Sequence, residues 1–487
     1  MNTPPATSTA PPAPRPLYRV RHLSQALHDP FPAVAALARW DRSDQYVAYE
    51  RPGEICFAAG ELASLRISRR RTRVTFDGRT TTTPTPADPL KAVTAFLAGL
   101  PVESWRVYGW AAFEFAYLLQ EGRAAHVPHQ HAGDSPDDDL LHVFLPRAEV
   151  RIGPAHIGLR SAEARLLDEL TDLLACVTDA DPLAGTRPLP VPDLDDAGNY
   201  RAAVAEAVTR IRAGDLEKVI LSRTVAVSAP VDLVASYVAG RRANTPARSY
   251  LLNLGRMRAA GFSPETVVEV APDGWVSAQP LAGTRALTGS AHDDAALRHN
   301  LLTDPKEIYE HAVSVRAVWD ELATLGAENT LRVDDFMNVR ERGSVQHLAS
   351  TVRSRPSDGS RPDTWPAFAA LFPSITATGI PKSAAYELIR ELEPNPRGLY
   401  AGTVLMTDSD GALDAGLVLR TLYQSAAPAV PGARRTWLQA GAGIVDRSTP
   451  EREHEETCEK LRSIAEFLVE DNNPSTTSCR TSYQNSI

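Results

Sequence analysis

The amino-acid sequence predicts an α/β fold, in which both halves of the chain contribute to one strand-rich, layered body. Short segments rich in β-branched and aromatic residues, bounded by turn residues, alternate with strongly amphipathic helices. A Pro- and Asp-rich segment at 180–196 marks the best internal boundary, but strands are predicted on both of its sides. The 487 residues are enough to bury a sizeable core.

Apolar spacing and β-branched content predict the individual elements, taken here in chain order. Before the boundary, strands are expected at 45–50, 64–68, 72–76, 140–152 and 156–160, and a leucine stripe predicts a helix over 163–177. After it, a helix is expected at 200–213 and strands at 217–227, 248–254, 266–270 and 275–278.

Composition divides the chain into four parts. Residues 1–15 are Pro-rich, and residues 471–487 are dominated by Asn, Ser and Thr, so both ends are expected to be disordered. Residues 16–190 are expected to form the N-terminal half of the α/β body. The remaining part, 191–470, carries the candidate catalytic residues.

Charge and cysteine content exclude several classes of protein. The formal net charge of −9 argues against binding to nucleic acid or to an anionic membrane, because both call for basic patches. No apolar run approaches the roughly 18 residues of a membrane span, and the N-terminus lacks the apolar core of a signal peptide. The four scattered cysteines form no CxxC motif or disulfide framework. We therefore expect a soluble protein of the reducing cytoplasm.

Two helices with acidic first turns suggest a metal site. Glu307 and Glu310 lie three residues apart in one predicted helix, as do Glu453 and Glu456 in another, so each pair can project from one helical face. A solvated acidic turn that favours the helix dipole is the alternative. If the pairs meet in space, a cation must offset their repulsion, and all-oxygen ligation favours Mg²⁺ over zinc.

Both acidic helices have clear start signals. Asp304 can cap the first helix and Pro305 suits its first position, while Thr449 precedes Pro450 at the start of the second. The apolar seam of the first helix is expected to consist of Ile308, Ala312, Val315, Trp319 and Leu322, and the core side of the second of Leu461, Ile464, Ala465 and Leu468.

Lys218 and Glu265 are candidates for proton transfer. Lys218 lies in an apolar strand, where burial favours the neutral amine that could act as a base. The alternative is a lysine at the strand edge with its ammonium in solvent. Glu265 follows a Ser-Pro turn and is either a general acid or a turn residue.

Two further features suggest recognition of an anion, and a third residue, His347, is available for catalysis. Gly441 and Gly443 leave backbone N–H groups approachable by a carboxylate or phosphate, although a short Gly-x-Gly is a weak signal. Arg420 ends an apolar strand and can bind a substrate carboxylate or form an ordinary salt bridge. His347 is a lone histidine among small and hydroxylated residues. Together these residues indicate a Mg²⁺-dependent enzyme for a small anionic substrate.

The segments that carry these residues resemble the chorismate-utilising enzymes, the group of anthranilate, isochorismate and salicylate synthases. The similarity runs from about 217 to 468, and within the group it is strongest to the salicylate synthases of siderophore pathways. The matching segments are KVILSR (218–223), PLAGTR (280–285), DFM (335–337), RERGSVQH (340–347), GIPK (379–382), RGLY (397–400) and EETCEK (455–460). The resemblance implies a single chorismate-binding domain of antiparallel sheets in a sandwich with helices outside, so that the two halves interleave.

The resemblance also implies roles for individual residues. Lys218 would activate water for attack at C2 of chorismate, and Glu265 would protonate the departing C4 hydroxyl. Glu310 and Glu456 would hold Mg²⁺, with Glu307 and Glu453 in the surrounding shell, while His347 and Thr376 would lie near the ring and the pyruvyl group. The other residues that match substrate-binding or active-site positions are Gly283, Thr284, Tyr400, Arg420, Gly441, Gly443 and Lys460.

The implied activity is that of a salicylate synthase, which forms isochorismate and then eliminates pyruvate. An isochorismate synthase that stops after the first step is the alternative enzyme, and a non-catalytic chorismate-binding protein is the alternative of another class. Ala282 replaces the nucleophilic lysine of certain aminodeoxychorismate synthases, and Lys218 replaces the glutamine usual in ammonia-using anthranilate synthases. The resemblance therefore implies a monomer without a glutaminase partner.

Overall fold

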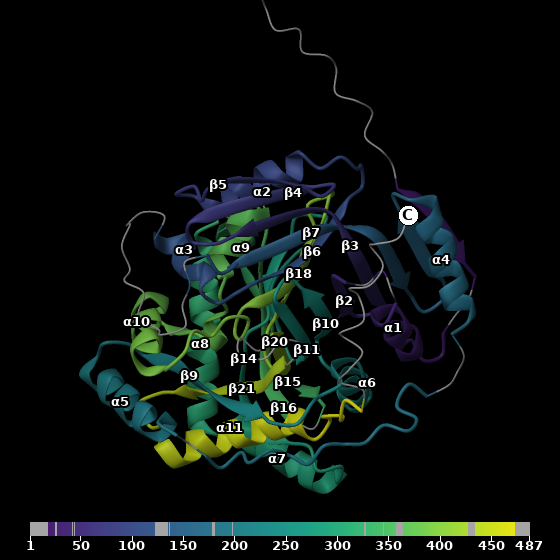
Figure 1. Ribbon diagram of the computed structural model, residues 1–487. Helices are drawn as coiled ribbons and strands as arrows, with labels where there is room; N and C mark the ends of the chain where they lie inside the picture. The colour runs from purple at the N-terminus through teal and green to yellow at the C-terminus, as the bar shows by residue number, and fades with distance from the viewer. Residues whose placement is uncertain are drawn as a thin grey trace, which may run out of the picture.

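The strands of the two halves pair with one another throughout the structure. A computed structural model describes residues 18–24, 27–40, 42, 44–121, 135, 137–177, 181–196, 198–325, 328–343, 345–356, 364–426 and 434–472. Within these residues all strands belong to one hydrogen-bonded network, and every pairing is antiparallel. Figure 1 shows helices on the outside of the strands, among them α4, α5, α10 and α11. β2 pairs with β10 and β6 with β18, so the halves interleave. The predicted ends, 1–15 and most of 471–487, lie outside the described residues.

The elements have the following bounds. The strands are β1 (Arg19–Leu23), β2 (Tyr46–Arg51), β3 (Glu54–Ile67), β4 (Arg71–Phe76), β5 (Arg79–Pro84), β6 (Arg106–Ala111), β7 (Leu141–Ile152), β8 (Ile157–Ser161), β9 (Lys218–Val227), β10 (Arg248–Leu254), β11 (Met257–Ser263), β12 (Thr266–Val270), β13 (Val276–Ala278), β14 (Leu281–Ala286), β15 (Arg332–Arg342), β16 (Val345–Ser354), β17 (Gly379–Ile380), β18 (Thr403–Asp408), β19 (Leu413–Leu417), β20 (Thr421–Ala426) and β21 (Arg434–Ile444). The helices are α1 (Phe31–Ala38), α2 (Pro89–Ala98), α3 (Phe115–Glu121), α4 (Ala164–Ala175), α5 (Tyr200–Ala213), α6 (Leu233–Ala243), α7 (Ala291–Thr303), α8 (Pro305–Ala323), α9 (Thr364–Leu371), α10 (Lys382–Leu392) and α11 (Pro450–Ala465), with the 3₁₀ turns η1 (Glu328–Thr330) and η2 (Ile375–Ala377).

Much of the sheet is buried on both faces. Side chains of successive strand residues point to opposite faces, and in β2 the side chains of Tyr46 and Ala48 enter one core while those of Val47 and Tyr49 enter the other. Helices α2, α3, α5, α8, α9 and α10 close the larger core, and α1, α4, α6 and α11 close the second. The predicted layered α/β fold with antiparallel sheets and outer helices is confirmed.

Most predicted elements are present, and the differences have local causes. The helix at 200–213 and the strands at 248–254 and 266–270 are confirmed. The strand predicted at 64–68 is instead the end of β3, which begins at Glu54. Gly60, with a φ of +69°, and a register shift between Glu61 and Ala63 interrupt the apolar alternation there, so the sequence hides its continuity.

The predicted seam of α8 is rotated from the observed one. The buried residues of this helix include Val315 and Leu322, as predicted, but Trp319 is exposed and Val318 is buried in its place. The same buried face carries the polar residues Glu307, His311 and Ser314. Apolar spacing could not locate this face because much of it is polar. No described helix is long and apolar enough to span a membrane.

A buried ion pair joins three separate segments of the chain. Arg397 and Glu393 are 2.6 Å apart, and their side chains are 1% and 4% exposed. Arg397 also donates hydrogen bonds to the carbonyl oxygens of Ala377 in η2 and Ile220 in β9. Its guanidinium lies 5.6 Å from the centre of the Tyr400 ring. One side chain therefore holds β9, η2 and the segment before β18 together.

Removing this guanidinium is expected to destabilise the fold strongly. In an Arg397→Met variant, Glu393 would be left buried without its cation, which typically costs about 3–5 kcal/mol. Urea unfolding should show a large drop in the transition midpoint. Arg316→Met is the matched control, because Arg316 forms an exposed pair with Asp320 on α8 and should leave the midpoint almost unchanged. Equal midpoints for the two variants would contradict the role given to Arg397.

Candidate active site

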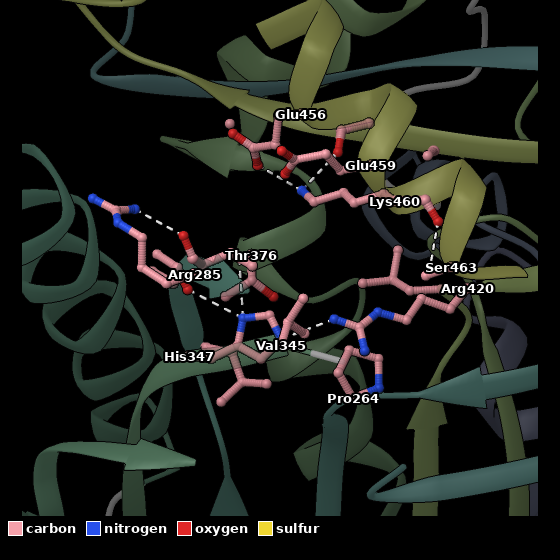
Figure 2. A pocket seen from close by; sticks show the side chains of 18 of the residues that line it. Pro264, Arg285, Val345, His347, Thr376, Arg420, Glu456, Glu459, Lys460 and Ser463 are labelled. Atoms are coloured by element: carbon pink, nitrogen blue, oxygen red, sulfur yellow. Dashed lines mark hydrogen bonds and ion pairs between the residues drawn. The ribbon is translucent and has the colours of Figure 1, made fainter. Parts of the chain in front are cut away.

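A cavity of about 840 Å³ lies between the sheet, α8 and α11, and it collects most of the predicted site residues. Figure 2 shows Glu456 and Lys460 of α11 on one side and His347 and Arg420 on the other. The predicted residues that line it are Glu265, Gly283, Thr284, Glu307, Glu310, His347, Thr376, Tyr400, Arg420, Gly441, Gly443, Glu456 and Lys460. Lys218 and Glu453 are not part of the lining. Lys218 contacts the lining residue Glu310, and Glu453 precedes the lining residue Glu456 by three positions on α11.

Lys218 is buried behind one wall of this cavity. It begins β9, and its side chain is 1% exposed. Its Nζ lies 2.7 Å from Glu310 Oε1 and donates a hydrogen bond to Ser314 Oγ at 3.3 Å. The alternative of a strand-edge lysine with its ammonium in solvent is therefore wrong. A buried lysine nitrogen in contact with a carboxylate and a hydroxyl is a candidate for proton transfer.

Glu265 is a buried carboxyl between β11 and β12. Oε1 accepts a hydrogen bond from the Thr376 hydroxyl at 2.5 Å, and Oε2 accepts one from the Leu281 amide at 3.0 Å. Burial raises the pKa of Glu265 to about 7, although these two hydrogen bonds and Lys218 lower it. Such a carboxyl holds a proton near neutral pH and can act as a general acid.

His347 and Arg420 form a pair at another wall. Arg420 donates from Nη2 to His347 Nε2 at 2.8 Å, so the histidine proton lies on Nδ1, which is 3.1 Å from the Gly283 carbonyl oxygen. Thr284 Oγ1 is also 3.1 Å from Nδ1. Burial and Arg420 lower the pKa of His347 to about 3. The imidazole therefore remains neutral and orients the guanidinium.

Arg420 has the surroundings of an anion-binding group. Among the described residues, its side chain contacts the Arg342 carbonyl oxygen and His347 and no carboxylate, so the predicted alternative of an ordinary salt bridge is not observed. Its φ of +49° is a left-handed conformation that costs on the order of 1–3 kcal/mol and is typical of functional sites. Burial and Arg342 lower the pKa of Arg420 to about 10, which still leaves it charged at neutral pH.

Gly441 and Gly443 make room for functional side chains. A Cβ atom at 441 would lie 2.7 Å from the Tyr400 hydroxyl, and one at 443 would lie 2.6 Å from Glu310 Oε1. The Gly441 carbonyl oxygen accepts a hydrogen bond from Lys460 Nζ at 2.9 Å. The two glycines thus allow β21 to pack closely against the Tyr400 hydroxyl and the Glu310 carboxylate. Their spacing in the sequence did not indicate this packing role.

The four glutamates come from two capped helices. The Asp304 side chain accepts from the Lys306 amide at the start of α8, and the Thr449 side chain accepts from the Arg452 amide at the start of α11, as predicted. Glu307 is 5% exposed and Glu453 is fully buried. The alternative of solvated acidic turns is therefore wrong for both helices.

Each glutamate lies beside a cationic side chain. Ion pairs join Glu307 to Arg285 and Arg452 at 3.1 and 3.3 Å, Glu310 to Lys218 at 2.7 Å, Glu453 to Lys306 at 3.4 Å, and Glu456 to Lys460 at 2.7 Å. Sequence reasoning missed Arg285, Arg452 and Lys306 as site residues. One feature of the sequence indicated such a role, the position of Arg285 at the end of the family-like PLAGTR segment.

The carboxylates nevertheless suit a hard cation. Burial and Glu310 raise the pKa of Glu307, and burial and Glu456 raise the pKa of Glu453, so the negative charges repel one another. Oε2 of Glu453 is buried without a hydrogen-bond partner. No three acidic, His or Cys side chains of the described residues converge as a metal cluster. The four glutamates offer only oxygen ligands, which Mg²⁺ prefers. A divalent cation would offset the repulsion among their negative charges and give Oε2 of Glu453 a partner.

Comparison with known proteins identifies the family. The sequence profile of the chorismate binding enzymes matches residues 45–466. The chain belongs to the chorismate-binding enzyme family. It is 42% identical over 430 residues to the salicylate synthase of Mycolicibacterium paratuberculosis, which covers 88% of this chain and 90% of that protein. It is 33% identical over 412 residues to anthranilate synthase component 1 of Streptomyces coelicolor, which covers 78% of this chain and 77% of that protein.

Solved structures of other chorismate-binding enzymes share the fold. Anthranilate synthase component I from Streptococcus pneumoniae aligns with a TM-score of 0.68 at 23% identity, over 86% of this chain and 92% of that one. The menaquinone-specific isochorismate synthase from Escherichia coli aligns with a TM-score of 0.66 at 23% identity, over 93% and 95%. At this identity the likeness establishes the architecture.

The environment of Glu265 predicts a carboxyl that titrates near neutrality. Infrared difference spectra across a pH series should show one protonated carboxyl, absent in Glu265→Gln, that ionises with a midpoint of about 7. Thr376→Val should move this midpoint upward, because the lost hydroxyl favours the ionised form. A midpoint at the ordinary value of 4.5 in the parent protein would contradict the described environment.

Proposed function

We propose that this protein is a salicylate synthase, which converts chorismate to isochorismate and then to salicylate and pyruvate. The observation that carries the proposal is the pair of proton-transfer groups at one cavity: the buried amine of Lys218 and the protonatable carboxyl of Glu265. The 42% identity to a salicylate synthase over most of both chains supports it. Ala282 lies in the cavity wall and offers no amine for covalent attack.

In the first step, water adds at C2 of the ring and the C4 hydroxyl departs. Lys218 would accept a proton from the attacking water, and Glu265 would donate its proton to the leaving hydroxyl, which departs as water. One proton is taken up and one is given, so the substrate charge is unchanged. A donor with a pKa near 7 is well matched to this task at neutral pH.

Glu310 and Glu456 would hold Mg²⁺, with Glu307 and Glu453 in the surrounding shell. The bound cation would supply positive charge to neutralise the ring carboxylate of the substrate. Arg285 and Arg452 contact Oε1 of Glu307 and so fix the orientation of that carboxylate. Lys306 does the same for Glu453. Arg420, which has no carboxylate partner among the described residues, would bind a carboxylate of the substrate together with Tyr400 and Lys460.

In the second step, the C2 hydrogen of isochorismate moves to the enolpyruvyl methylene as the carbon–oxygen bond of that arm breaks. This releases pyruvate and leaves the aromatic ring of salicylate. The step needs positioning rather than a proton donor. His347 and Thr376 are fixed by hydrogen bonds to Arg420 and Glu265, and they would hold the arm over the ring.

The proposal extends to the setting of the enzyme. A lysine rather than a glutamine at position 218 supports water over ammonia as the nucleophile, so no glutaminase partner is expected. We expect a cytoplasmic monomer whose salicylate enters siderophore biosynthesis or another secondary pathway.

The decisive assay is incubation of the purified protein with chorismate and Mg²⁺, followed by chromatography. We expect salicylate and an equal amount of pyruvate. Lys218→Ala should lower the first step by at least about 100-fold, the usual size of a general-base contribution, with an unchanged melting temperature as the control. Isochorismate alone would identify an isochorismate synthase, and binding without turnover would identify a non-catalytic chorismate-binding protein.

Metal dependence is a separate prediction. Chelation should abolish turnover, and added Mg²⁺ should restore it. Calorimetry should show weaker Mg²⁺ binding in Glu310→Gln and Glu456→Gln, because each variant loses one anionic ligand. Glu387→Gln, which changes an exposed glutamate on α10, is the matched control and should bind Mg²⁺ like the parent. Full activity in chelator would overturn the metal assignment.

A further inference from the structure

Ser314 is a buried hydroxyl to which the mechanism above gives no role. Its side chain is fully buried on α8, and its Oγ donates a hydrogen bond to the Glu310 carbonyl oxygen at 2.8 Å. The same Oγ lies 3.3 Å from Lys218 Nζ. A hydroxyl has one hydrogen, and here it is already committed to the helix backbone. Toward Lys218 it can therefore act only as an acceptor.

Helical spacing aligns Ser314 with two of the proposed metal ligands. Glu307, Glu310 and Ser314 occupy positions i, i+3 and i+7 of α8, so they follow one another along one face. Lys218 reaches this face from the first position of β9. Among the described residues, its nitrogen has two polar partners, Glu310 Oε1 at 2.7 Å and Ser314 Oγ at 3.3 Å.

The two partners of Lys218, Glu310 and Ser314, differ in whether they also line the cavity. Glu310 lines the cavity, and under the proposed function its carboxylate also holds Mg²⁺. Ser314 does not line the cavity and is held by the helix that carries it. Its position is therefore set by the fold, whereas that of the Glu310 carboxylate depends also on what occupies the site.

We propose that Ser314 is a positioning residue that aims the Lys218 amine at the attacking water during the first reaction step. This inference rests on the proposed function. A lysine side chain has many rotamers, and a buried acceptor at a fixed point selects the one that reaches the reacting atoms.

The proposal makes the two reaction steps respond differently. Water addition to chorismate requires the Lys218 amine in place, while elimination of pyruvate from isochorismate requires no base. Loss of the Ser314 hydroxyl should therefore slow the first step alone. A merely structural serine would, when removed, affect both steps together.

The test compares Ser314→Ala with the parent enzyme, using chorismate and isochorismate as separate substrates. We expect kcat for chorismate to fall roughly tenfold or more, in line with the cost of a small misplacement. The KM for chorismate, the Mg²⁺ affinity by calorimetry and the turnover of isochorismate should stay at parent values. Ser314→Thr, which keeps the hydroxyl, should recover most of the chorismate turnover.

Ser236→Ala is the matched control. Ser236 is also a buried helical serine that donates to the carbonyl four residues earlier, Asp232 at 2.7 Å, but it lies on α6 outside the cavity lining. Its variant should turn over both substrates normally. Equal losses on both substrates in Ser314→Ala, no loss on either, or no recovery in Ser314→Thr would each overturn the positioning role. A parent enzyme that converts neither substrate would instead overturn the proposed function.

Discussion

The buried ion pair between Arg397 and Glu393 is the constraint on which the site depends. The guanidinium hydrogen-bonds to backbone carbonyls of β9 and η2 and stacks near Tyr400, so it fixes the strand that begins with Lys218 and the turn that contains Thr376. Glu393 in turn accepts from the Ser222 amide of β9 at 2.7 Å. The ion pair therefore holds groups from three separate segments of the chain at fixed distances, because breaking a buried ion pair is strongly unfavourable.

A second level of organisation is the balance of charge around the cavity. Four glutamates face five cationic side chains, and each carboxylate is paired at one oxygen by a residue that arrives from another element or another turn of its own helix. Such pairing lets several like charges share a low-dielectric region at a tolerable cost. Arg420 lies apart from this arrangement, oriented by a neutral histidine, and so keeps its charge available for a ligand.

The sequence carries much of this structure but leaves out its geometry. The starts of α8 and α11 follow from Asp304, Pro305, Thr449 and Pro450, because capping is a local interaction. The buried face of α8 could not be read from apolar spacing, since it turns Glu307, His311 and Ser314 inward to meet strands from distant segments. Motif resemblance brought most site residues together, whereas the charge partners Arg285, Arg452 and Lys306 required coordinates.

The pairing of β9 with β21 has a consequence for how such a site can diversify. Backbone hydrogen bonds fix the register of Ile220 against Gly443, and Gly443 itself leaves no space between the strand and Glu310. The distance from the first residue of β9 to the acidic helix is therefore a property of the main chain. Which functional group meets Glu310 at this distance is set by the side chain at position 218, here the Nζ atom of a lysine. A change of side chain at this position would alter the group presented to Glu310 without altering the strand register that holds its main chain.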